Sequence, residues 1–236
     1  MDKVSAVCRK EFMTAIVLLS GGVDSATCLA LAVERYGKEN VIALSSEYGQ
    51  KHNKESEYAQ KIADYYGVKR LLIDLSSVMQ YSDCSLLKHS GKEIVKGAYS
   101  EQTDGKTPVS TYVPFRNGLF LSVAAAIGLS LGASEIWYGA HADDAAGAAY
   151  PDCSEQFVSK INNAIMEGTA GQIKVIAPYS NTNKAGVVKD GLRMKVPYEY
   201  TWSCYEGKEK PCGKCGTCID RRKAFEINGV KDPAME

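Results

Sequence analysis

The chain has 236 residues, of which 45% are hydrophobic and 24% are charged, as in a globular protein of one large domain or one domain with an appendage. Its 28 Lys and Arg balance 28 Asp and Glu, which argues against a protein held mainly by nucleic-acid phosphates or by an anionic membrane. No apolar run reaches the roughly 18 residues of a membrane span, and the short run before Ser20 is interpreted as a strand rather than a signal peptide.

Five strand-like runs alternate with helix-like segments along the chain. The strands are expected over residues 14–20, 40–50, 69–77, 134–141 and 173–180. The helices are expected over residues 24–36, 54–67, 116–132, 153–168 and 183–196. Residues 80–114 are polar and rich in Ser, Gly and Lys, which is long for a passive loop, so we expect a flexible excursion that is able to cover a substrate.

This alternation predicts βαβ units and therefore an α/β fold with a doubly wound, mostly parallel five-stranded sheet. Ligands of such a sheet bind beyond the carboxyl ends of its strands. We expect residues 1–195 to form the α/β domain and residues 196–236 to form a cysteine-containing segment packed on it.

The stretch SGGVDS, residues 20–25, stands where the first strand ends and the first helix begins. Glycine permits unusual backbone angles, successive N–H groups form a nest for an anion, and the helix points its positive end there. The hydroxyl groups of Ser20, Ser25 and Thr27 add donors, so the turn predicts a phosphate or pyrophosphate site. Asp24 is expected to cap the helix or to hold a Mg²⁺ ion between phosphates. The alternative is a plain glycine-rich turn in which Asp24 or Ser25 caps the helix.

Four of the eight cysteines crowd into residues 204–218. This spacing argues for reduced thiols and a metal site rather than disulfides, and it favours a cytoplasmic protein. Two overlapping C-x-x-C steps aim sulfurs at one point, where four thiolates satisfy a structural Zn²⁺; the alternative is a redox dithiol or unrelated thiols. Cys8, Cys28 and Cys84 are interpreted as core or surface thiols. The expected metal ligands are Cys204, Cys212, Cys215 and Cys218.

Five motifs occur in order and together carry a resemblance. They are LLSGGVDSATC, STYVPFRNGLFLSVAAAIG, YPDCSEQF, NKAGVVK and TWSCYEGKEKPCGKCGTCIDRRKAFEINGVKDP. The first resembles the PP-loop of ATP pyrophosphatases, and the combination resembles the 7-cyano-7-deazaguanine synthase (QueC) family of the queuosine and archaeosine pathway. The resemblance covers the chain from Thr14 to Pro233. It implies an adenine nucleotide alpha hydrolase-like, Rossmann-like fold.

The resemblance also implies an ATP-dependent ligase that forms C–N bonds. ATP adenylates the carboxylate of 7-carboxy-7-deazaguanine, ammonia displaces AMP to give an amide, and a second ATP activates the amide oxygen. Loss of AMP then leaves the nitrile of 7-cyano-7-deazaguanine (preQ0), with AMP and pyrophosphate released. ATP, Mg²⁺ and a structural Zn²⁺ are the implied cofactors. The implied assembly is a homodimer whose partners are small molecules, without nucleic acid or membrane.

The matched motifs imply the site residues. The catalytic groups would be Asp24, Ser25, Arg116 and Asp152. The substrate would be contacted by Arg116, Asn117, Tyr150, Asp152 and Lys184. The nucleotide would be held by Leu19, Ser20, Gly21, Gly22, Val23, Asp24, Ser25, Ala26, Thr27, Cys28 and Leu29.

Some of these roles have local alternatives. Arg116 could bind a phosphate or carboxylate through two N–H groups, or it could pair locally. Asp152 could accept hydrogen bonds from the amino edge of the base or cap the next helix, and Tyr150 could stack on the ring. Lys184 could reach a phosphate or remain a solvated surface lysine. The segment before Tyr150 departs from the D-x-S-G-Y-P-D-C-R pattern of many family members, and Ser154 stands where an arginine is usual.

The histidines carry weaker signals. His52 follows the second strand on the ligand side of the sheet, so it could lie near the nucleotide or at the polar surface. His89 and His141 are isolated, and neither has metal-ligand spacing to a partner.

Two other functions compete with this reading. One is another PP-loop adenylating enzyme: an amide synthetase, a tRNA-thiolating enzyme, or a QueC-like enzyme with a different acceptor. Thiolation needs a reactive cysteine near ATP, and Cys153 is the candidate. The other is a zinc-ribbon module for nucleic acid, against which the neutral charge balance and the missing aromatic-plus-basic stripe both argue.

Overall fold

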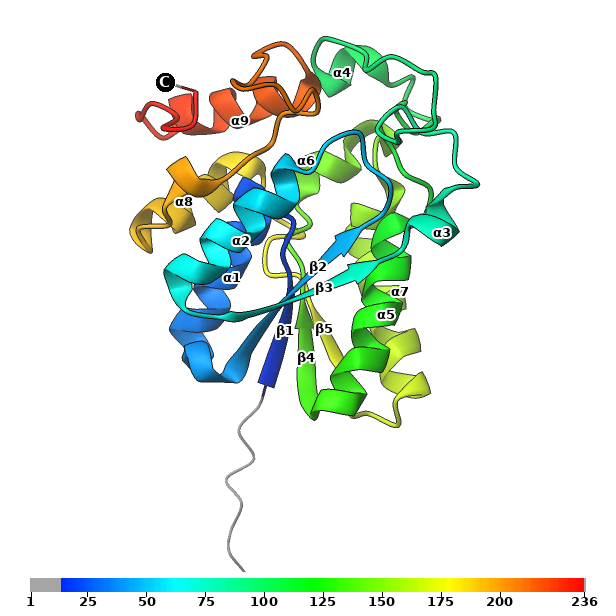
Figure 1. Ribbon diagram of the computed structural model, residues 1–236, viewed down its shortest axis with the longest axis vertical. Helices are drawn as coiled ribbons and strands as arrows, with labels where there is room; N and C mark the ends of the chain where they lie inside the picture. The colour runs from blue at the N-terminus through cyan, green and yellow to red at the C-terminus, as the bar shows by residue number, and fades with distance from the viewer. Residues whose placement is uncertain (1–13, 236) are drawn as a thin grey trace, which may run out of the picture.

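A computed structural model describes residues 14–235 and shows a parallel β-sheet covered by helices (Figure 1). The strand order is β3-β2-β1-β4-β5, and every pairing is parallel, which confirms the predicted doubly wound sheet. Cys8 and the start of the expected α/β domain lie outside the described residues. The strands are β1 (Thr14–Leu18), β2 (Val41–Glu47), β3 (Lys69–Asp74), β4 (Ala133–Trp137) and β5 (Lys174–Ile176).

Helices cover both faces of the sheet (Figure 1). The helices on the first face are α1 (Val23–Tyr36), α2 (Lys54–Tyr66) and α8 (Lys184–Arg193). The helices on the second face are α5 (Arg116–Leu131) and α7 (Glu155–Gly168). The central strand serves both cores, since Ala15 and Val17 pack under α1 and α2 whereas Ile16 packs under α5. This alternation follows from the two-residue period of a strand, and burial on both faces is typical of parallel sheets.

The remaining elements are short, apart from a C-terminal helix that the sequence patterns did not indicate. The short α-helices are α3 (Ser76–Met79), α4 (Tyr99–Gln102) and α6 (Ala142–Ala145), and the C-terminal helix is α9 (Gly216–Ile227). Single 3₁₀ turns form at Lys38–Asn40, Ala146–Ala148, Pro151–Cys153 and Tyr198–Tyr200. No helix within residues 14–235 is long and apolar enough to cross a membrane.

All five predicted strands end earlier than expected, four of them by three or more residues, and after several of them the chain leaves the sheet to line a cavity. The runs 40–50, 134–141 and 173–180 pair only as far as Glu47, Trp137 and Ile176. The residues that follow the second and fourth strands, among them Tyr48 and Tyr138, form walls of that cavity instead.

The excursion over residues 80–114 is packed against the rest of the molecule. Cys84, Leu86, Leu87 and Val113 form a small apolar core together with Tyr48 at the end of β2. In Figure 1 this segment and α4 lie beside α9, above the carboxyl edge of the sheet. The excursion therefore covers the edge where a ligand of this fold is expected to bind.

Candidate active site

A cavity of about 230 Å³ lies at the carboxyl edge of the sheet. Its floor includes Leu19 after β1, Ser45 in β2 and Tyr138 after β4, and its roof includes Tyr99 and Tyr205. Strands β2 and β4 flank β1 on opposite sides, so the cavity lies at the point where the strand order reverses. Open α/β sheets bind their ligands at this switch point.

The turn after β1 has the geometry of an anion site. Gly21 has a φ of +87°, and a Cβ at this position would collide with the Glu55 carbonyl oxygen. Gly22 is the N-cap of α1, so the first N–H groups of that helix lie at the edge of the cavity. The prediction that Asp24 caps the helix is wrong, because the helix already begins at Val23.

The serine hydroxyl groups of this turn face the cavity, but the threonine hydroxyl does not. Ser20 Oγ lies 3.1 Å from Ser25 Oγ and accepts a 3.3 Å hydrogen bond from Gly22 N. The hydroxyl of Thr27 is buried, donates to a backbone carbonyl in its own helix and lies 2.7 Å from the hydroxyl of Tyr198. The prediction that Thr27 supplies a phosphate donor is therefore wrong, since its position on the helix points it into the core.

The predicted nucleotide residues divide into two groups. Those that line the cavity are Leu19, Ser20, Gly22, Asp24 and Ser25. Those that are buried behind the turn are Gly21, Val23, Ala26, Thr27, Cys28 and Leu29. A sequence motif does not show which face of its helix turns inward, so the predicted set extended too far along α1. Of the two alternatives given for Cys28, a core or a surface thiol, the structure shows the core thiol.

Lys184, at the start of α8, is 8% exposed, and its Nζ lies 2.7 Å from Asp24 Oδ2. The interpretation of this residue as a solvated surface lysine is therefore wrong. Burial alone would raise the pKa of Asp24, but the charges of Lys184 and His141 lower that pKa below its ordinary value. Burial likewise opposes the charge on Lys184, and the carboxylates of Asp24 and Asp144 outweigh it and raise the lysine pKa. The site thus holds a charged pair beside the turn.

His141 is part of this charged group and is not isolated. Its side chain is almost completely buried, and its Nε2 lies 3.4 Å from Asp144 Oδ2 and 3.4 Å from Lys184 Nζ. Asp220, at the start of α9, lines the same cavity, and burial raises the pKa of both Asp144 and Asp220. The sequence patterns did not reveal these three residues, because the chain brings them together from the start of α6 and from α9.

The Asp24 carboxylate beside the turn fits Mg²⁺. Asp24 Oδ1 is buried and has no hydrogen-bond partner among residues 14–235. Asp144 and Asp220 line the cavity with it. Mg²⁺ in nucleotide sites takes one or two carboxylate oxygens together with phosphates, so the unpaired Asp24 Oδ1 suits such an ion. Asp144 and Asp220 do not converge with it on one point as the four cysteines do, and they add negative charge at the same wall.

Arg116 and Asn117 begin helix α5 and both line the cavity. Arg116 Nη1 donates to the Tyr48 hydroxyl at 3.0 Å, and its guanidinium lies 5.2 Å from the centre of that ring. Asn117 Nδ2 donates to Cys153 Sγ at 3.2 Å. Burial raises the pKa of the Cys153 thiol well above its ordinary value, so this cysteine is a poor candidate for the nucleophile that thiolation needs.

Asp152 lies behind the cavity wall and is not among the residues that line it. Its Oδ2 accepts a 2.9 Å hydrogen bond from Asn117 N, and burial raises its pKa. Helix α7 is capped by Ser154, whose hydroxyl accepts from Phe157 N, so the alternative that Asp152 caps this helix is wrong. In this structure Asp152 fixes the start of α5 and, through it, Arg116.

Tyrosine side chains form the other end of the cavity. The hydroxyl oxygen of Tyr150 lies 2.6 Å from Thr111 Oγ1 and 3.2 Å from the hydroxyl oxygen of Tyr205. The Tyr99 hydroxyl lies 2.5 Å from that of Tyr205, and the Tyr99 and Tyr150 rings meet edge to face at 5.5 Å. Such rings offer flat apolar surface with polar rims, which suits a planar heteroaromatic ligand. Stacking by Tyr150 stays a prediction.

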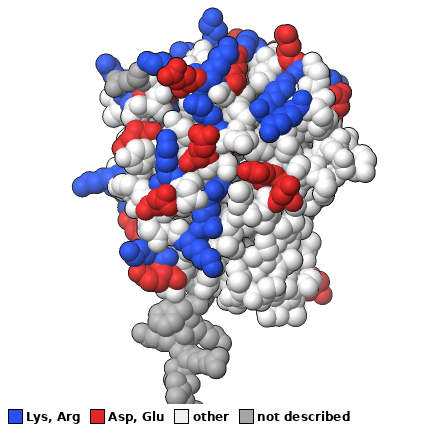
Figure 2. Space-filling view, viewed as in Figure 1, with Lys and Arg blue, Asp and Glu red and all other residues white. Residues whose placement is uncertain are grey.

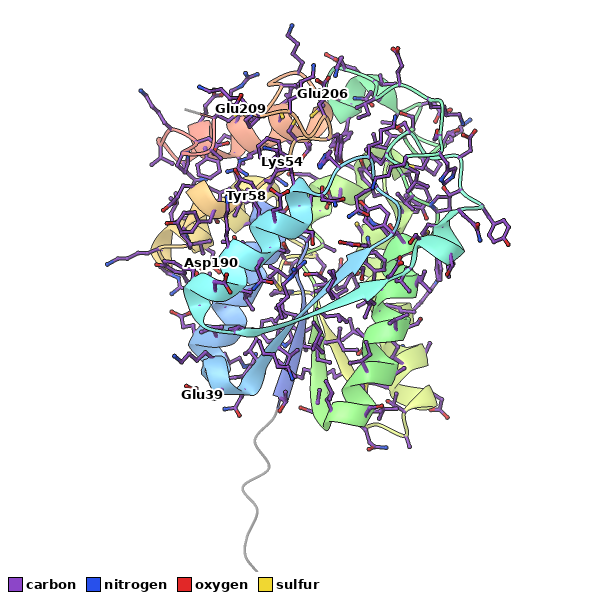
Figure 3. All side chains as sticks on the ribbon, in the orientation of Figure 1. Glu39, Lys54, Tyr58, Asp190, Glu206 and Glu209 are labelled. Carbon is purple, nitrogen blue, oxygen red and sulfur yellow. The ribbon has the colours of Figure 1, made fainter. Side chains whose placement is uncertain are left out.

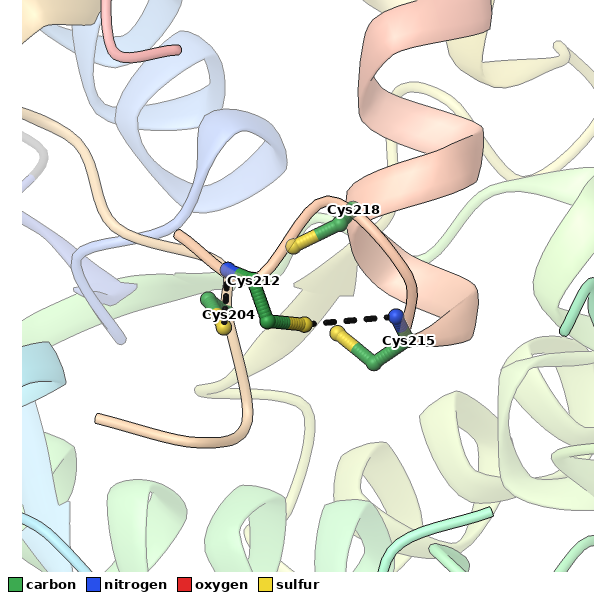
Figure 4. A group of neighbouring side chains, drawn as sticks. All are labelled: Cys204, Cys212, Cys215 and Cys218. Carbon is green, nitrogen blue, oxygen red and sulfur yellow. Dashed lines mark hydrogen bonds between the residues drawn. The ribbon is translucent and has the colours of Figure 1, made fainter. Parts of the chain in front are cut away.

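The four clustered cysteines converge on one point (Figure 4). All four Sγ atoms lie within 4.8 Å of one another. Cys204 Sγ accepts from Cys212 N at 3.3 Å, and Cys212 Sγ accepts from Cys215 N at 3.4 Å. Backbone N–H groups that donate to sulfur favour thiolates, so Cys204, Cys212, Cys215 and Cys218 fit a tetrahedral metal ion such as Zn²⁺.

The cysteine segment packs directly on the phosphate-binding turn. Trp202 N donates to Gly21 O at 2.8 Å, and the Trp202 ring lies 5.5 Å from the ring of Tyr58. Lys54 Nζ lies 4.8 Å from the centre of the same indole. Figure 3 shows Lys54 and Tyr58 on α2 below the segment that carries Glu206. Helix α2 therefore connects the floor of the cavity to the cysteine segment.

The excursion is attached to the same segment from the other side. Lys96 forms a β-bridge with Cys215 and an ion pair with Glu206, and Gly97 N donates to Lys214 O at 3.0 Å. A Cβ on Gly216 would collide with the Tyr99 ring, so the first turn of α9 lies against that ring. The roof of the cavity is thus one assembly of the excursion and the cysteine segment.

The parallel sheet, the SGGVDS turn at its switch point and the cavity beyond it define an α/β protein of the PP-loop class. The structure of NMN synthetase from Francisella tularensis has a similar fold, with a TM-score of 0.50 and 13% sequence identity, over 92% of this chain and 78% of that chain.

The particular family follows from the sequence comparisons. The family model described as queuosine biosynthesis protein QueC matches residues 14–229, and the chain belongs to this family. It is 41% identical over 218 residues to the 7-cyano-7-deazaguanine synthase of Psychromonas ingrahamii, covering 92% of this chain and 95% of that relative. It is 42% identical over 224 residues to the 7-cyano-7-deazaguanine synthase of Archaeoglobus fulgidus, covering 94% of this chain and 90% of that relative. The resemblance indicated by the motifs is confirmed.

Proposed function

We propose that this protein uses ATP to convert 7-carboxy-7-deazaguanine and ammonia into 7-cyano-7-deazaguanine, with release of AMP and pyrophosphate. Membership of the QueC family and the names of its relatives support the reaction. The observation that carries the proposal is the continuity of the main cavity, which joins a phosphate-binding turn at one end to a tyrosine-lined compartment at the other. A substrate held among the tyrosines would present its carboxylate to ATP held at the turn.

The turn end would bind the triphosphate. The N–H groups after Gly22 and the hydroxyl groups of Ser20 and Ser25 would contact phosphate oxygens, and Lys184 would balance their charge. Asp24 would hold Mg²⁺, and the carboxylates of Asp144 and Asp220 would add negative charge beside that ion. That ion would share the charge of the phosphates while the substrate oxygen attacks the α-phosphorus and pyrophosphate leaves.

The tyrosine end would bind the deazaguanine. Tyr150 would stack on its ring, and Arg116 would bind its carboxylate through paired N–H groups, because this guanidinium lies at the wall of the cavity beside Tyr48. Asn117 would contact the base. Asp152 becomes a positioning residue in this proposal, since its carboxylate holds the backbone of Asn117 and lies outside the cavity.

The four thiolates would hold Zn²⁺ in a structural role. Four sulfur ligands leave no open position for a substrate or a water molecule, so the ion would fold the chain rather than act on the substrate. Residues 196–236 are therefore proposed as an appendage of the α/β domain of residues 1–195. Reduced thiolates suit a reducing compartment, which supports a cytoplasmic location.

We also propose a homodimer. Leu129 and Leu131 near the end of α5 are 41% and 47% exposed. In Figure 2 charged side chains gather over the part of the molecule with α1, α2, α8 and α9, and few appear over α5 and α7. An exposed apolar face of this kind favours association, so light scattering is expected to give twice the chain mass. A monomeric mass would contradict the dimer without bearing on the reaction.

The reaction is tested by incubating the purified protein with 7-carboxy-7-deazaguanine, ammonium, ATP and Mg²⁺. Mass spectrometry is expected to show the nitrile together with AMP and pyrophosphate. ADP and inorganic phosphate as products would contradict the mechanism. AMP release that requires a different acceptor would favour another PP-loop enzyme of the kinds named above.

A further inference from the structure

A second, smaller cavity adjoins the main one beside the start of α2. Its volume is about 10 Å³, which is the space for roughly one water molecule. Most of its lining also lines the main cavity, so the two cavities share a wall. The shared residues are Tyr48, Gln50, Glu55, Leu86 and Tyr205.

One buried polar atom at the smaller cavity lacks a partner. His52 Nδ1 is buried and has no hydrogen-bond partner within residues 14–235. Beside it the half-buried Glu55 carboxylate lines the same cavity and interacts electrostatically with Arg116 and His52. Buried polar groups are normally satisfied by protein, water or an ion. A cavity for one small molecule that offers an unpaired ring nitrogen and a carboxylate therefore indicates a small ligand that donates hydrogen bonds.

The surroundings select a cation rather than an anion. The Glu55 carboxylate is accompanied by Tyr48 and Tyr205, and carboxylates and aromatic rings together are the usual partners of ammonium-type cations. Lys51 also lines the cavity, but its Nζ donates to the Lys92 carbonyl oxygen at 2.7 Å and is not paired with the Glu55 carboxylate.

Three segments line this cavity. A Cβ on Gly207 would collide with the His52 ring, so the cysteine segment lies directly against that side chain. Gln50 forms a β-bridge with Leu87, and Lys51 N donates to Leu86 O at 2.8 Å, which attaches the excursion to the loop after β2. These segments partly shield a small ion from bulk water, which strengthens its interaction with a carboxylate.

We propose that the smaller cavity binds the ammonium ion that supplies the new nitrogen, and that Glu55 accepts its proton. This inference rests on the proposed function, in which ammonia is the second substrate. Ammonium transfers one proton to the Glu55 carboxylate, and the nitrogen lone pair forms a C–N bond to the adenylated carboxyl carbon. The C–O bond to AMP breaks, and its electron pair leaves with the AMP phosphate. The surplus proton on nitrogen passes to that phosphate or to solvent.

The electrostatic setting agrees with this role. Burial raises the pKa of the Glu55 carboxyl above its ordinary value, against the opposing effects of Arg116 and His52. A carboxylate with a raised pKa is a stronger base than an exposed one, as general base catalysis requires.

Glu55→Gln tests the inference because it keeps the shape of the side chain and removes its charge and basicity. The KM for ammonium is expected to rise roughly 10- to 100-fold, as for loss of a hydrogen bond to a charged group. Exchange of pyrophosphate into ATP, driven by the carboxy-deazaguanine without ammonium, should stay near the native rate. Hydroxylamine, which is uncharged at neutral pH, should react with the adenylated substrate at a near-native rate.

Glu57→Gln is the matched control, since Glu57 is exposed on the same helix and lines neither cavity. Its KM for ammonium should be native. An unchanged ammonium KM in Glu55→Gln would overturn the inference, and so would equal losses of pyrophosphate exchange and of the hydroxylamine reaction.

A binding measurement separates this inference from the proposed function. Ammonium chloride is expected to raise the Tm of the native protein relative to sodium chloride, and not that of Glu55→Gln. Equal shifts in both proteins would overturn the ammonium site. Absence of pyrophosphate exchange in the native protein would instead contradict the proposed function.

Discussion

The floor and the roof of the main cavity are built in different ways. The floor depends on residues 19–25, which are contiguous and are held at the end of β1 by the central sheet. The roof brings together Tyr99 from the excursion, Tyr150 from the loop after α6 and Tyr205 from the cysteine segment. The phosphate-binding turn is therefore local in sequence, although Lys184, Asp144 and Asp220 join it from other segments, whereas the tyrosine end consists entirely of remote segments that have packed together.

The floor and the roof should therefore depend on different interactions for their geometry. The floor should hold its geometry as long as the sheet is folded, because its turn is fixed by Gly21 against α2. The roof should depend on its anchors, which are the cysteine cluster and the buried ion pair between Arg221 and Asp232. Variants that affect one part and spare the other test this division.

Cys215→Ser should have the largest effect, because it removes one of four thiolates at the centre of the roof. Metal binding at such sites contributes free energy on the order of 10 kcal/mol, so metal content should fall toward zero and the roof should unfold. Metal analysis together with thermal denaturation measures this. Cys84→Ser, at a buried thiol outside the cluster, should keep its metal. A stable and fully active Cys215→Ser protein would refute the folding role of the metal.

Asp24→Asn should abolish most of the turnover while the roof of the cavity stays folded. The change removes the carboxylate that pairs with Lys184 and that we propose as a Mg²⁺ ligand. We expect kcat to fall about 10³-fold, as for loss of a group that stabilises developing charge. Metal content at the cysteines should remain native. Asp64→Asn, on the exposed side of α2, is the control, and near-native turnover by Asp24→Asn would contradict the role of the turn.

Arg221→Met should destabilise the roof without changing any group that lines the cavity. Arg221 Nε lies 2.6 Å from Asp232 Oδ2, and both side chains are almost fully buried. Loss of one partner leaves the other charge buried and unpaired, which should lower the free energy of unfolding by about 3–5 kcal/mol. Urea denaturation measures the loss. The double variant Arg221→Met with Asp232→Leu should recover most of it, and a single-variant loss below about 1 kcal/mol would contradict the anchoring role.

Ser154→Ala should have the smallest effect. The Ser154 hydroxyl caps α7 by accepting from Phe157 N at 3.1 Å, so its removal should cost about 1 kcal/mol of stability. The value of kcat/KM should not change, since Ser154 does not line the cavity. Ser159→Ala, on the exposed side of the same helix, should leave stability nearly unchanged or slightly raised. A large loss of activity in Ser154→Ala would indicate a direct substrate contact.

The sequence was informative wherever one segment carries the signal. The sheet, the long helices before the cysteine segment, the SGGVDS turn and the convergence of the four cysteines were all predicted, because each depends on local periodicity or spacing. The predictions that Asp24 caps α1 and that Thr27 faces a phosphate were wrong. The rotation of a helix relative to the site is set by packing, which the motif does not contain.

The sequence did not predict which residues from distant segments meet in the folded protein. His141 was predicted to be isolated, and Lys184 was left between two alternatives, yet both lie beside Asp24. Glu55 lies outside the matched motifs, and Asp220 lies within the last of them but was not singled out. Both reach the cavity because α2 and α9 pack against its edge. Their proximity depends on tertiary packing between distant elements.

The most direct test of the account is a crystal structure with an ATP analogue that resists cleavage between the α- and β-phosphates. The phosphates are expected on the N–H groups after Gly22, between the hydroxyl of Ser25 and the Asp24–Lys184 pair, with space left beneath the tyrosines for the base. An analogue bound elsewhere, with the turn after β1 making no phosphate contact, would contradict the assignment of the floor and the reaction built on it.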